Sequence, residues 1–184
     1  MNKKETKQET KKGNGSVRTL KGSELLSEAP PEILADMEGK CRWLNFEANQ
    51  IIVDRDDEST DVYLIISGKV KVMDFLADDQ EIALAELGPG ASFGELSAMD
   101  KSKRSARVTA LEDTVMATIS STDFRRLLMD VPGIAIMLLK RFAALIRTLN
   151  TRITALSTMT PHQRVYYELI RMSEPNPQGD GSWL

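Results

Sequence analysis

Short runs of apolar and β-branched residues, separated by polar turns, fill the chain from about residue 42 to 119. Many short strands at such regular spacing predict a β-sandwich or barrel. The segments before and after this region have helical patterns instead, so the fold class is predicted to be α+β. The β-favouring runs are RWLNF, QIIVD, VYLIISGKVKVM, EIALAEL, SARVTALE and TVMATIS.

The helical part after Ser120 begins with SSTDFRRLLMD, a start signal followed by one apolar face. Pro132 then opens a long run over about 133–158, and Thr160 with Pro161 predicts the start of a further helix.

The long run carries apolar residues at four-three spacing, which is typical of a coiled-coil seam. Ile146 and Ile153 lie beside this stripe and form a second apolar face. One helix with two apolar faces needs two partners. We therefore predict a parallel homodimer, in which the stripe pairs with a second copy and Ile146 and Ile153 pack on the β-domain. A helix buried only against its own domain is the alternative. The stripe comprises Leu138, Phe142, Leu145, Leu149, Leu156 and Met159.

Composition excludes several classes of site. Of 184 residues, 41% are apolar and 28% charged, as in soluble proteins, and no apolar run is long enough to span a membrane. The N-terminus has no apolar signal region, so a cytoplasmic location is expected.

A single cysteine, Cys41, and a single histidine, His162, exclude a disulfide, a structural zinc site and ligation of haem or an iron–sulfur cluster. We expect no metal and no catalytic residues. The acidic run 54–61 lacks the glycine and glutamate of a calcium-binding loop.

The net charge is −3, of which residues 1–15 contribute +3 from five lysines and two glutamates, so the remainder carries −6. Residues 1–16 are interpreted as a disordered, basic tail, with weak nucleic-acid contact as the alternative. An acidic body does not attract nucleic acid by its overall field. Any anion site must therefore be a local constellation.

The segment FGELSAMDKSKRSA, residues 93–106, contains such a constellation. Gly94 allows close backbone approach, and a short helix opening at Glu95 offers unpaired N–H groups to an anion. Arg104 offers a planar, permanently charged fork, and Ser105 adds a hydroxyl. A carboxylate beside a phosphate suits neighbouring sugar hydroxyls. Together these residues predict a nucleotide site.

The segment resembles the phosphate-binding cassette of the cyclic nucleotide-binding domains, through Phe93-Gly94-Glu95-Leu96, Arg104-Ser105-Ala106, Val108 and Ala110. The resemblance covers about residues 30–160, with LIISGKVKV and LGPGASFGEL inside it. The Arg-Ser-Ala variant and the long helix resemble the bacterial catabolite activator branch. This resemblance implies a double-stranded β-helix, or jelly-roll-like β-roll, flanked by N-terminal helices and a long C-terminal dimerisation helix.

The resemblance also implies residue roles. Glu95 would bind the ribose 2′-hydroxyl beside the Gly94 backbone, with Leu96 in the same ligand-binding set, and Arg104 and Ser105 would bind the cyclic phosphate. A polar residue on the long helix would cap the purine. Asn150 is the first choice and Thr151 the second, with plain helix surface as the alternative for both.

The chain departs from the resemblance at Lys101-Ser102-Lys103, where family members often carry glycine and proline. An ion-paired hairpin without a ligand is therefore kept as an alternative to a nucleotide site.

The resemblance implies an allosteric, cAMP-sensing, non-enzymatic part of a dimeric transcription regulator, with cGMP as a possible ligand. TPHQRVYYELIRMS resembles the first helix of a helix-turn-helix, so DNA binding would need a further C-terminal domain. The expected units are the tail 1–16, the β-roll with its helices 17–131, the dimerisation helix 132–159 and the helix-turn-helix start 160–184. A regulatory module that controls a partner other than DNA is the alternative.

Overall fold

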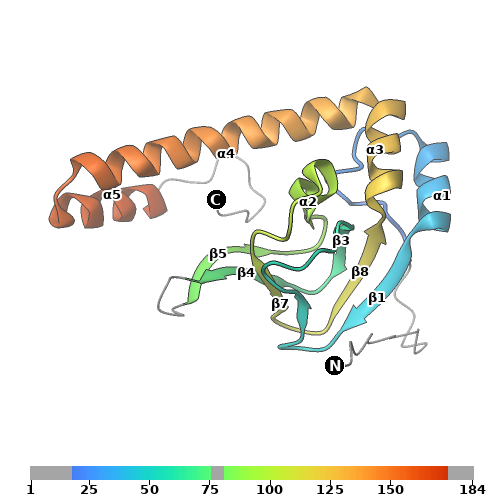
Figure 1. The fold of residues 1–184 in the computed structure, drawn as a ribbon, viewed down its shortest axis with the longest axis horizontal. Coiled ribbons are helices and arrows are strands. Elements are labelled where there is room, and N and C mark those ends of the chain that lie inside the picture. The colour runs from blue at the N-terminus through green and yellow to red at the C-terminus, as the bar shows by residue number, and fades with distance from the viewer. Residues whose placement is uncertain (1–17, 76–80, 174–184) are drawn as a thin grey trace.

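The computed structural model describes residues 18–75 and 81–173. Its centre is a roll of two four-stranded antiparallel sheets (Figure 1). The first sheet has the order β1(Arg42–Phe46), β8(Thr114–Ile119), β3(Val62–Ser67), β6(Ser92–Phe93), and the second has the order β2(Ile51–Val53), β7(Arg107–Ala110), β4(Val70–Phe75), β5(Glu81–Leu87). The predicted fold class is confirmed as an antiparallel β-core with helices.

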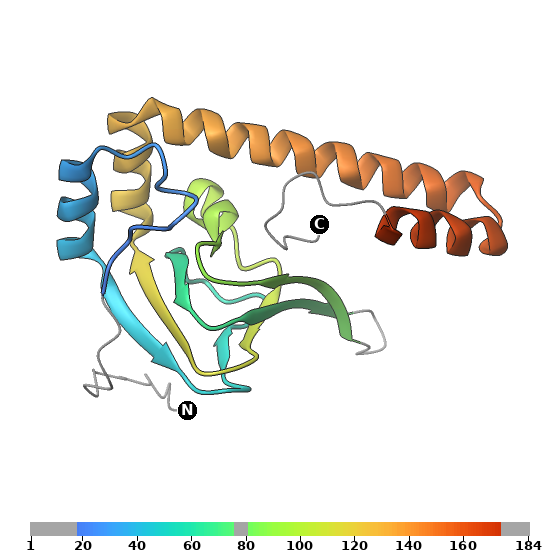
Figure 2. The ribbon, with the colours of Figure 1, turned by 180° about the vertical axis from the view of Figure 1, so that it is seen from behind.

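Five helices complete the described part of the chain: α1(Pro31–Lys40), α2(Glu95–Asp100), α3(Ser121–Asp130), α4(Pro132–Thr158) and α5(Pro161–Ser173). Helix α4 extends well past the β-roll, and α5 turns back beneath its far end (Figures 1 and 2). The predicted tail 1–16 and residues 174–184 of the last predicted unit lie outside the described residues.

The central strand of the first sheet, β3, is buried on both faces, which explains why it is apolar without alternation. Successive side chains of a strand point to opposite faces. On β3, Val62 and Leu64 belong to the core shared with the helices, whereas Tyr63 and Ile65 belong to the core between the sheets. The sheet therefore holds the helical layer and the roll together.

Helix α3 joins the sheet to α4. The Ser120 hydroxyl accepts a hydrogen bond from the backbone N–H of Asp123 at 3.1 Å and donates to the Asp123 carboxylate at 2.6 Å, so the predicted start signal is a true cap. Phe124 and Leu127 are buried in the helical core, as the periodicity predicted. Pro132 then starts α4 at once, and Ile134 anchors α4 in the same core.

The α4 face that was expected to pack on the β-domain is exposed. The start of the predicted stripe is buried in the chain's own core, whereas Leu149 farther along that stripe is 43% exposed. Leu138 is only 4% exposed and packs in the chain's own core, and Phe142 packs against that core. Leu139, Ile146 and Ile153 are instead 67%, 57% and 60% exposed. The rotation of α4 is set where Ile134 enters the core. At about 100° per residue, this rotation turns the 139–146–153 stripe roughly a quarter turn away from Leu138.

A capping box marks the turn between α4 and α5. The side-chain oxygen of Gln163 accepts from the backbone N–H of Thr160 at 2.9 Å and from the Thr160 hydroxyl at 3.1 Å. Pro161 occupies the first helical position, where its missing N–H costs little. No helix in the described part of the chain is long and apolar enough to cross a membrane.

Candidate functional site: the cassette between β6 and β7

The cassette begins at a glycine that no other residue can replace without strain. Gly94 has φ +92°, in the left-handed region. A Cβ at this position would collide with Nη1 of Arg104 and lie 2.8 Å from the carbonyl oxygen of Asp61. Residue 94 therefore brings the backbone against the arginine, and α2 opens directly after it at Glu95, as the sequence predicted.

Local hydrogen bonds hold the segment Lys101-Ser102-Lys103, which contains neither glycine nor proline. Lys101 ends α2 in the left-handed conformation, with φ +61°, and its N–H bonds to the carbonyl of Ser97 at 3.0 Å. The Asp100 carboxylate accepts from the backbone N–H of Ser102 at 2.8 Å, which lowers the pKa of that carboxyl. The turn therefore places Arg104 at the site without glycine or proline in the segment 101–103.

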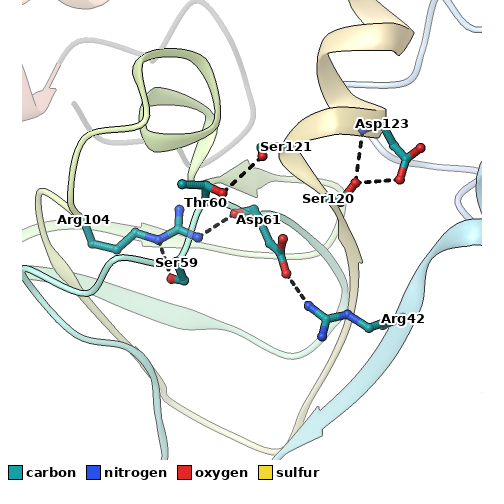
Figure 3. Close-up of polar contacts among 8 residues, drawn as sticks. All are labelled: Arg42, Ser59, Thr60, Asp61, Arg104, Ser120, Ser121 and Asp123. Atoms are coloured by element: carbon teal, nitrogen blue, oxygen red, sulfur yellow. Dashed lines mark hydrogen bonds and ion pairs between the residues drawn. The ribbon is translucent and has the colours of Figure 1, made fainter.

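Arg104 is the best-buried charged side chain of the cassette, at 4% exposure. Its Nε–H donates to the Ser59 hydroxyl oxygen at 3.0 Å, and its Nη2 donates to the carbonyl of Asp61 at 2.6 Å (Figure 3). Its Nη1 donates to the carbonyl of Gly94 at 3.2 Å. Three neutral acceptors thus fix the plane of the guanidinium.

Arg104 makes no ion pair with any carboxylate in the described ranges 18–75 and 81–173. The guanidinium carbon lies 5.6 Å from the centre of the Tyr63 ring, and that ring stacks on Phe93 with centroids 4.9 Å apart. Burial lowers the pKa of Arg104, while Tyr63 and Asp61 oppose that effect. Since arginine remains charged in proteins, the site contains a desolvated cation that lacks a counter-charge at contact distance.

Glu95 faces the long helix as well as the cassette. Its Oε1 accepts from the Ser92 hydroxyl and from Nη1 of Arg141 on α4, the latter at 3.3 Å. Arg141 also bonds to the Ser92 hydroxyl at 3.1 Å and to the Ser92 carbonyl at 3.3 Å. The carboxylate of Glu95 is therefore paired with Arg141. Arg104 has no carboxylate at ion-pair distance among the described residues, although the charges of Asp61, Asp57 and Glu95 act to raise its pKa.

Several polar groups have no hydrogen bond to the described residues. A guanidinium has five N–H donors, of which Arg104 uses three, so two remain. Oε2 of Glu95 has no donor, and the hydroxyl of Ser105, which is exposed, has no partner. The chain thus presents two N–H donors and a hydroxyl suited to an anion, and a carboxylate oxygen suited to a hydroxyl.

The other residues predicted to bind the ligand are exposed, and those on α4 lie away from the cassette. Leu96 is half exposed on α2. Asn150 and Thr151 are exposed on α4, at nine and ten residues, or about 14–15 Å, beyond Arg141. The Thr151 hydroxyl donates to the carbonyl of Arg147 at 3.0 Å. No contact in the described structure joins either residue to the cassette of the same chain.

Sequence reasoning did not find Ser59, Tyr63 or Arg141. The acidic run that contains Ser59 was considered only as a calcium-binding loop, which its pattern excludes, and Tyr63 lies in a predicted strand. Arg141 was detectable as a cation between the apolar residues Leu138 and Leu145, but its partner Glu95 lies 46 positions away. No group of three potential metal ligands occurs in the part of the chain that the structure describes.

Residues 43–131 match the model of the cyclic nucleotide-binding domain. The cyclic AMP receptor protein of Thermus thermophilus is 31% identical over 153 residues, which cover 83% of this chain and 71% of that protein. The chain belongs to the cyclic nucleotide-binding domain family. Within the family it is similar to the catabolite activator type, as its cassette and long helix predicted.

Two solved structures that are similar to this chain belong to an activator protein and to a kinase regulatory subunit. The Thermus thermophilus catabolite activator protein has 30% identity and a TM-score of 0.67, covering 72% of this chain and 62% of that one. A regulatory subunit of a cAMP-independent protein kinase A from Trypanosoma brucei has 26% identity and a TM-score of 0.56, covering 65% of this chain and 43% of that one.

An enzyme also contains a related segment. Lysophospholipase nte1 of Neosartorya fischeri is 32% identical over 136 residues, which are 74% of this chain but 9% of that protein. The chain therefore spans about a tenth of the length of the lysophospholipases it matches.

Proposed function

We propose that this chain is the cAMP-sensing part of a dimeric, cytoplasmic transcription regulator. The observation that carries the proposal is Arg104, a buried cation. Among the residues that the structure describes, no carboxylate contacts it and two of its N–H donors have no acceptor. Burying a charge without a partner is unfavourable, so such a site favours an anionic ligand. A cyclic phosphate supplies one negative charge and two exocyclic oxygens.

The neighbouring groups narrow the ligand from any anion to a nucleotide. The Ser105 hydroxyl follows Arg104 and would donate to the same phosphate. Oε2 of Glu95 would accept from the ribose 2′-hydroxyl, while Oε1 stays on Arg141. Inorganic phosphate offers no hydroxyl donor in the matching place, whereas a ribose cyclic phosphate offers both groups. The chain of Thermus thermophilus that it resembles is a cyclic AMP receptor.

Arg141 provides the route from the ligand to the long helix. Any change in the position or charge environment of Glu95 acts directly on α4, because the two residues share a hydrogen bond. The ligand shifts α4 only to the extent that it binds one arrangement of this contact better than another. We propose that this difference in affinity is what controls the regulator.

The effect of ligand binding would reach the DNA-binding part through a homodimer formed by α4. The exposed stripe Leu139, Ile146 and Ile153 has seven-residue spacing and is the proposed seam between two copies of α4. Helix α5 would begin the helix-turn-helix that contacts DNA. Asn150 and Thr151 are the proposed contacts for the purine, reached across the seam from the second copy.

Calorimetric titration with cAMP and cGMP tests the proposal, and tighter binding of cAMP is expected. Arg104→Ala should weaken binding by about 30- to 1,000-fold, because a charge-assisted phosphate contact contributes about 2–4 kcal/mol. Arg126→Ala is the matched control, since Arg126 is an exposed arginine on α3 paired with Asp130. Undiminished binding by Arg104→Ala would exclude the cassette as the site.

A regulatory module for a partner other than DNA is the second candidate. It is favoured by the relatives in which the same domain is a small part of a lysophospholipase or belongs to a kinase regulatory subunit. The oligomeric state separates the two functions. A dimer whose α4–α4 distance changes with cAMP, measured between spin labels, supports the transcription regulator. A monomer with and without cAMP supports the module.

A further inference from the structure

The loop between β2 and β3 holds Arg104 by its backbone as well as by its side chain. The N–H of Arg104 donates to the carbonyl of Asp57 at 2.9 Å, and the N–H of Asp56 donates to the carbonyl of Arg104 at 3.0 Å. The guanidinium then bonds to Ser59 and to the carbonyl of Asp61 on the same loop. The orientation of Arg104 therefore depends on this loop more than on its own strand.

Ser59 is the only side chain among the three acceptors of Arg104; the other two are backbone carbonyls. The surrounding loop, DRDDESTD, has five carboxylates in eight residues, yet a neutral hydroxyl reaches the guanidinium. The carboxylates of Asp54 and Asp61 pair with other arginines, Arg107 and Arg42 respectively. The loop is therefore acidic, but no carboxylate is in contact with Arg104.

The two loop residues directly after Ser59 are tied to the rest of the fold. The Thr60 hydroxyl donates to the hydroxyl of Ser121 at the start of α3, at 3.1 Å, and the Asp61 carboxylate pairs with Arg42 on β1 (Figure 3). Ser59 thus presents its oxygen from an anchored segment. An anchored acceptor fixes the direction of the Nε–H, and with it the direction of the donors left for a ligand.

We propose that Ser59 is a positioning residue for the ligand-binding arginine, in that it orients Arg104 without neutralising it. The inference rests on the proposed function for its consequence in nucleotide binding. A carboxylate at residue 59 would pair with Arg104 and compete with the cyclic phosphate. A hydroxyl orients the guanidinium of Arg104 without neutralising its positive charge, which then remains available to the ligand. An apolar side chain would leave the charge in place but free the Nε–H, so that only the carbonyls of Gly94 and Asp61 would hold the guanidinium.

Four variants of the full chain test this: Ser59→Ala, Ser59→Thr, Ser59→Asp and Thr60→Val. Ser59→Ala should weaken cAMP binding about 5- to 10-fold, because one hydrogen bond to a charged group is lost and water partly replaces it. Ser59→Thr should restore wild-type affinity. Ser59→Asp should weaken binding more than Ser59→Ala. Thr60→Val is the matched control, since it removes a neighbouring hydroxyl that contacts Ser121 and not Arg104.

The Nε–H signal of Arg104 in nitrogen-edited NMR tests the positioning without any ligand. It should be protected from solvent exchange in the wild type, Ser59→Thr and Thr60→Val, and lost in Ser59→Ala. An unchanged signal in Ser59→Ala, or cAMP binding equal to wild type, would overturn the proposal, as would tighter binding by Ser59→Asp. If the wild type binds neither cAMP nor cGMP, the proposed function fails, and the Nε–H signal alone decides whether Ser59 positions Arg104.

Discussion

Arg141 of the long helix donates a hydrogen bond to Oε1 of Glu95, the first residue of the cassette helix, at 3.3 Å. Both residues also bond to the hydroxyl of Ser92. The ligand site and the element proposed to carry the output therefore share a single carboxylate. The side chain of Arg141 is 43% exposed and that of Glu95 only 8%. Arg141 can therefore move away into solvent while Glu95 stays buried.

A double-mutant cycle over Glu95→Gln and Arg141→Met measures this coupling. Because Arg141 is partly exposed, its pairing should contribute no more than about 1 kcal/mol to the free energy of unfolding. Glu95→Gln should weaken cAMP binding about tenfold, since a carboxylate accepts a ribose hydroxyl more strongly than an amide does. In the cycle, the effects of the two substitutions on cAMP affinity should not be additive. Strict additivity would mean that Arg141 does not communicate with the cassette.

Arg104→Lys should bind cAMP about 10- to 100-fold more weakly than the wild type, although the charge is kept. A lysine ammonium is a compact charge that cannot form the planar fork, so it cannot satisfy Asp61, Gly94 and a phosphate together. Fluorescence titration with a labelled cyclic nucleotide measures the loss. Equal affinity would show that charge alone, and not geometry, defines the site.

Gly94→Ala should lower both stability and ligand affinity. The left-handed φ of residue 94 and the 2.8 Å approach to the Asp61 carbonyl should together cost about 2 kcal/mol in the free energy of unfolding. Gly39→Ala is the matched control, because Gly39 lies inside α1, where a Cβ meets no atom within 4 Å. That control should be neutral or stabilising by about 0.5–1 kcal/mol. Urea denaturation of both variants separates them.

Ile146→Glu should convert the proposed dimer into a monomer. A carboxylate placed in an apolar seam is desolvated without a partner, which opposes association. Lys140→Glu, at an exposed polar position of the same helix, should leave the dimer intact. Light scattering at micromolar concentration gives the mass of each. A wild-type monomer, or a dimer that survives Ile146→Glu, would contradict the seam.

Cys41 should react slowly with thiol reagents at neutral pH. Burial, with smaller contributions from the charges of Asp123 and Glu38, raises the pKa of Cys41 from 9.0 to about 11. At about pH 8, roughly a thousandth of the thiol would be ionised, and the thiolate is the reactive form. The folded state keeps this proton after the unfolded state has lost it, so stability should fall as pH rises from about 9 to 11. Cys41→Ser should remove both effects, as measured by thiol titration and by denaturation against pH.

The sequence alone predicted the elements whose signals are local. Alternating and β-branched runs predicted the strands, the Ser120 cap predicted α3, and the spacing from Gly94 to Ser105 predicted the cassette. Each of these depends on residues a few positions apart, for which backbone geometry fixes what neighbours can do. The resemblance to cyclic nucleotide-binding domains rested on the same short segment, and the comparisons confirm that family.

Tertiary structure alone decided which face of α4 is buried and which partners the cassette residues have. Both faces of α4 are apolar, so the pattern cannot say which one meets the core; the entry of Ile134 beside α3 decides it and exposes Ile146 and Ile153. Ser59 and Arg141 reach the cassette from 45 and 46 residues away. Such contacts follow from how the sheets and helices pack, which no local periodicity encodes. The sequence thus determined which charged residues form the site, and the packing determined that Arg104 has no carboxylate at ion-pair distance among the described residues.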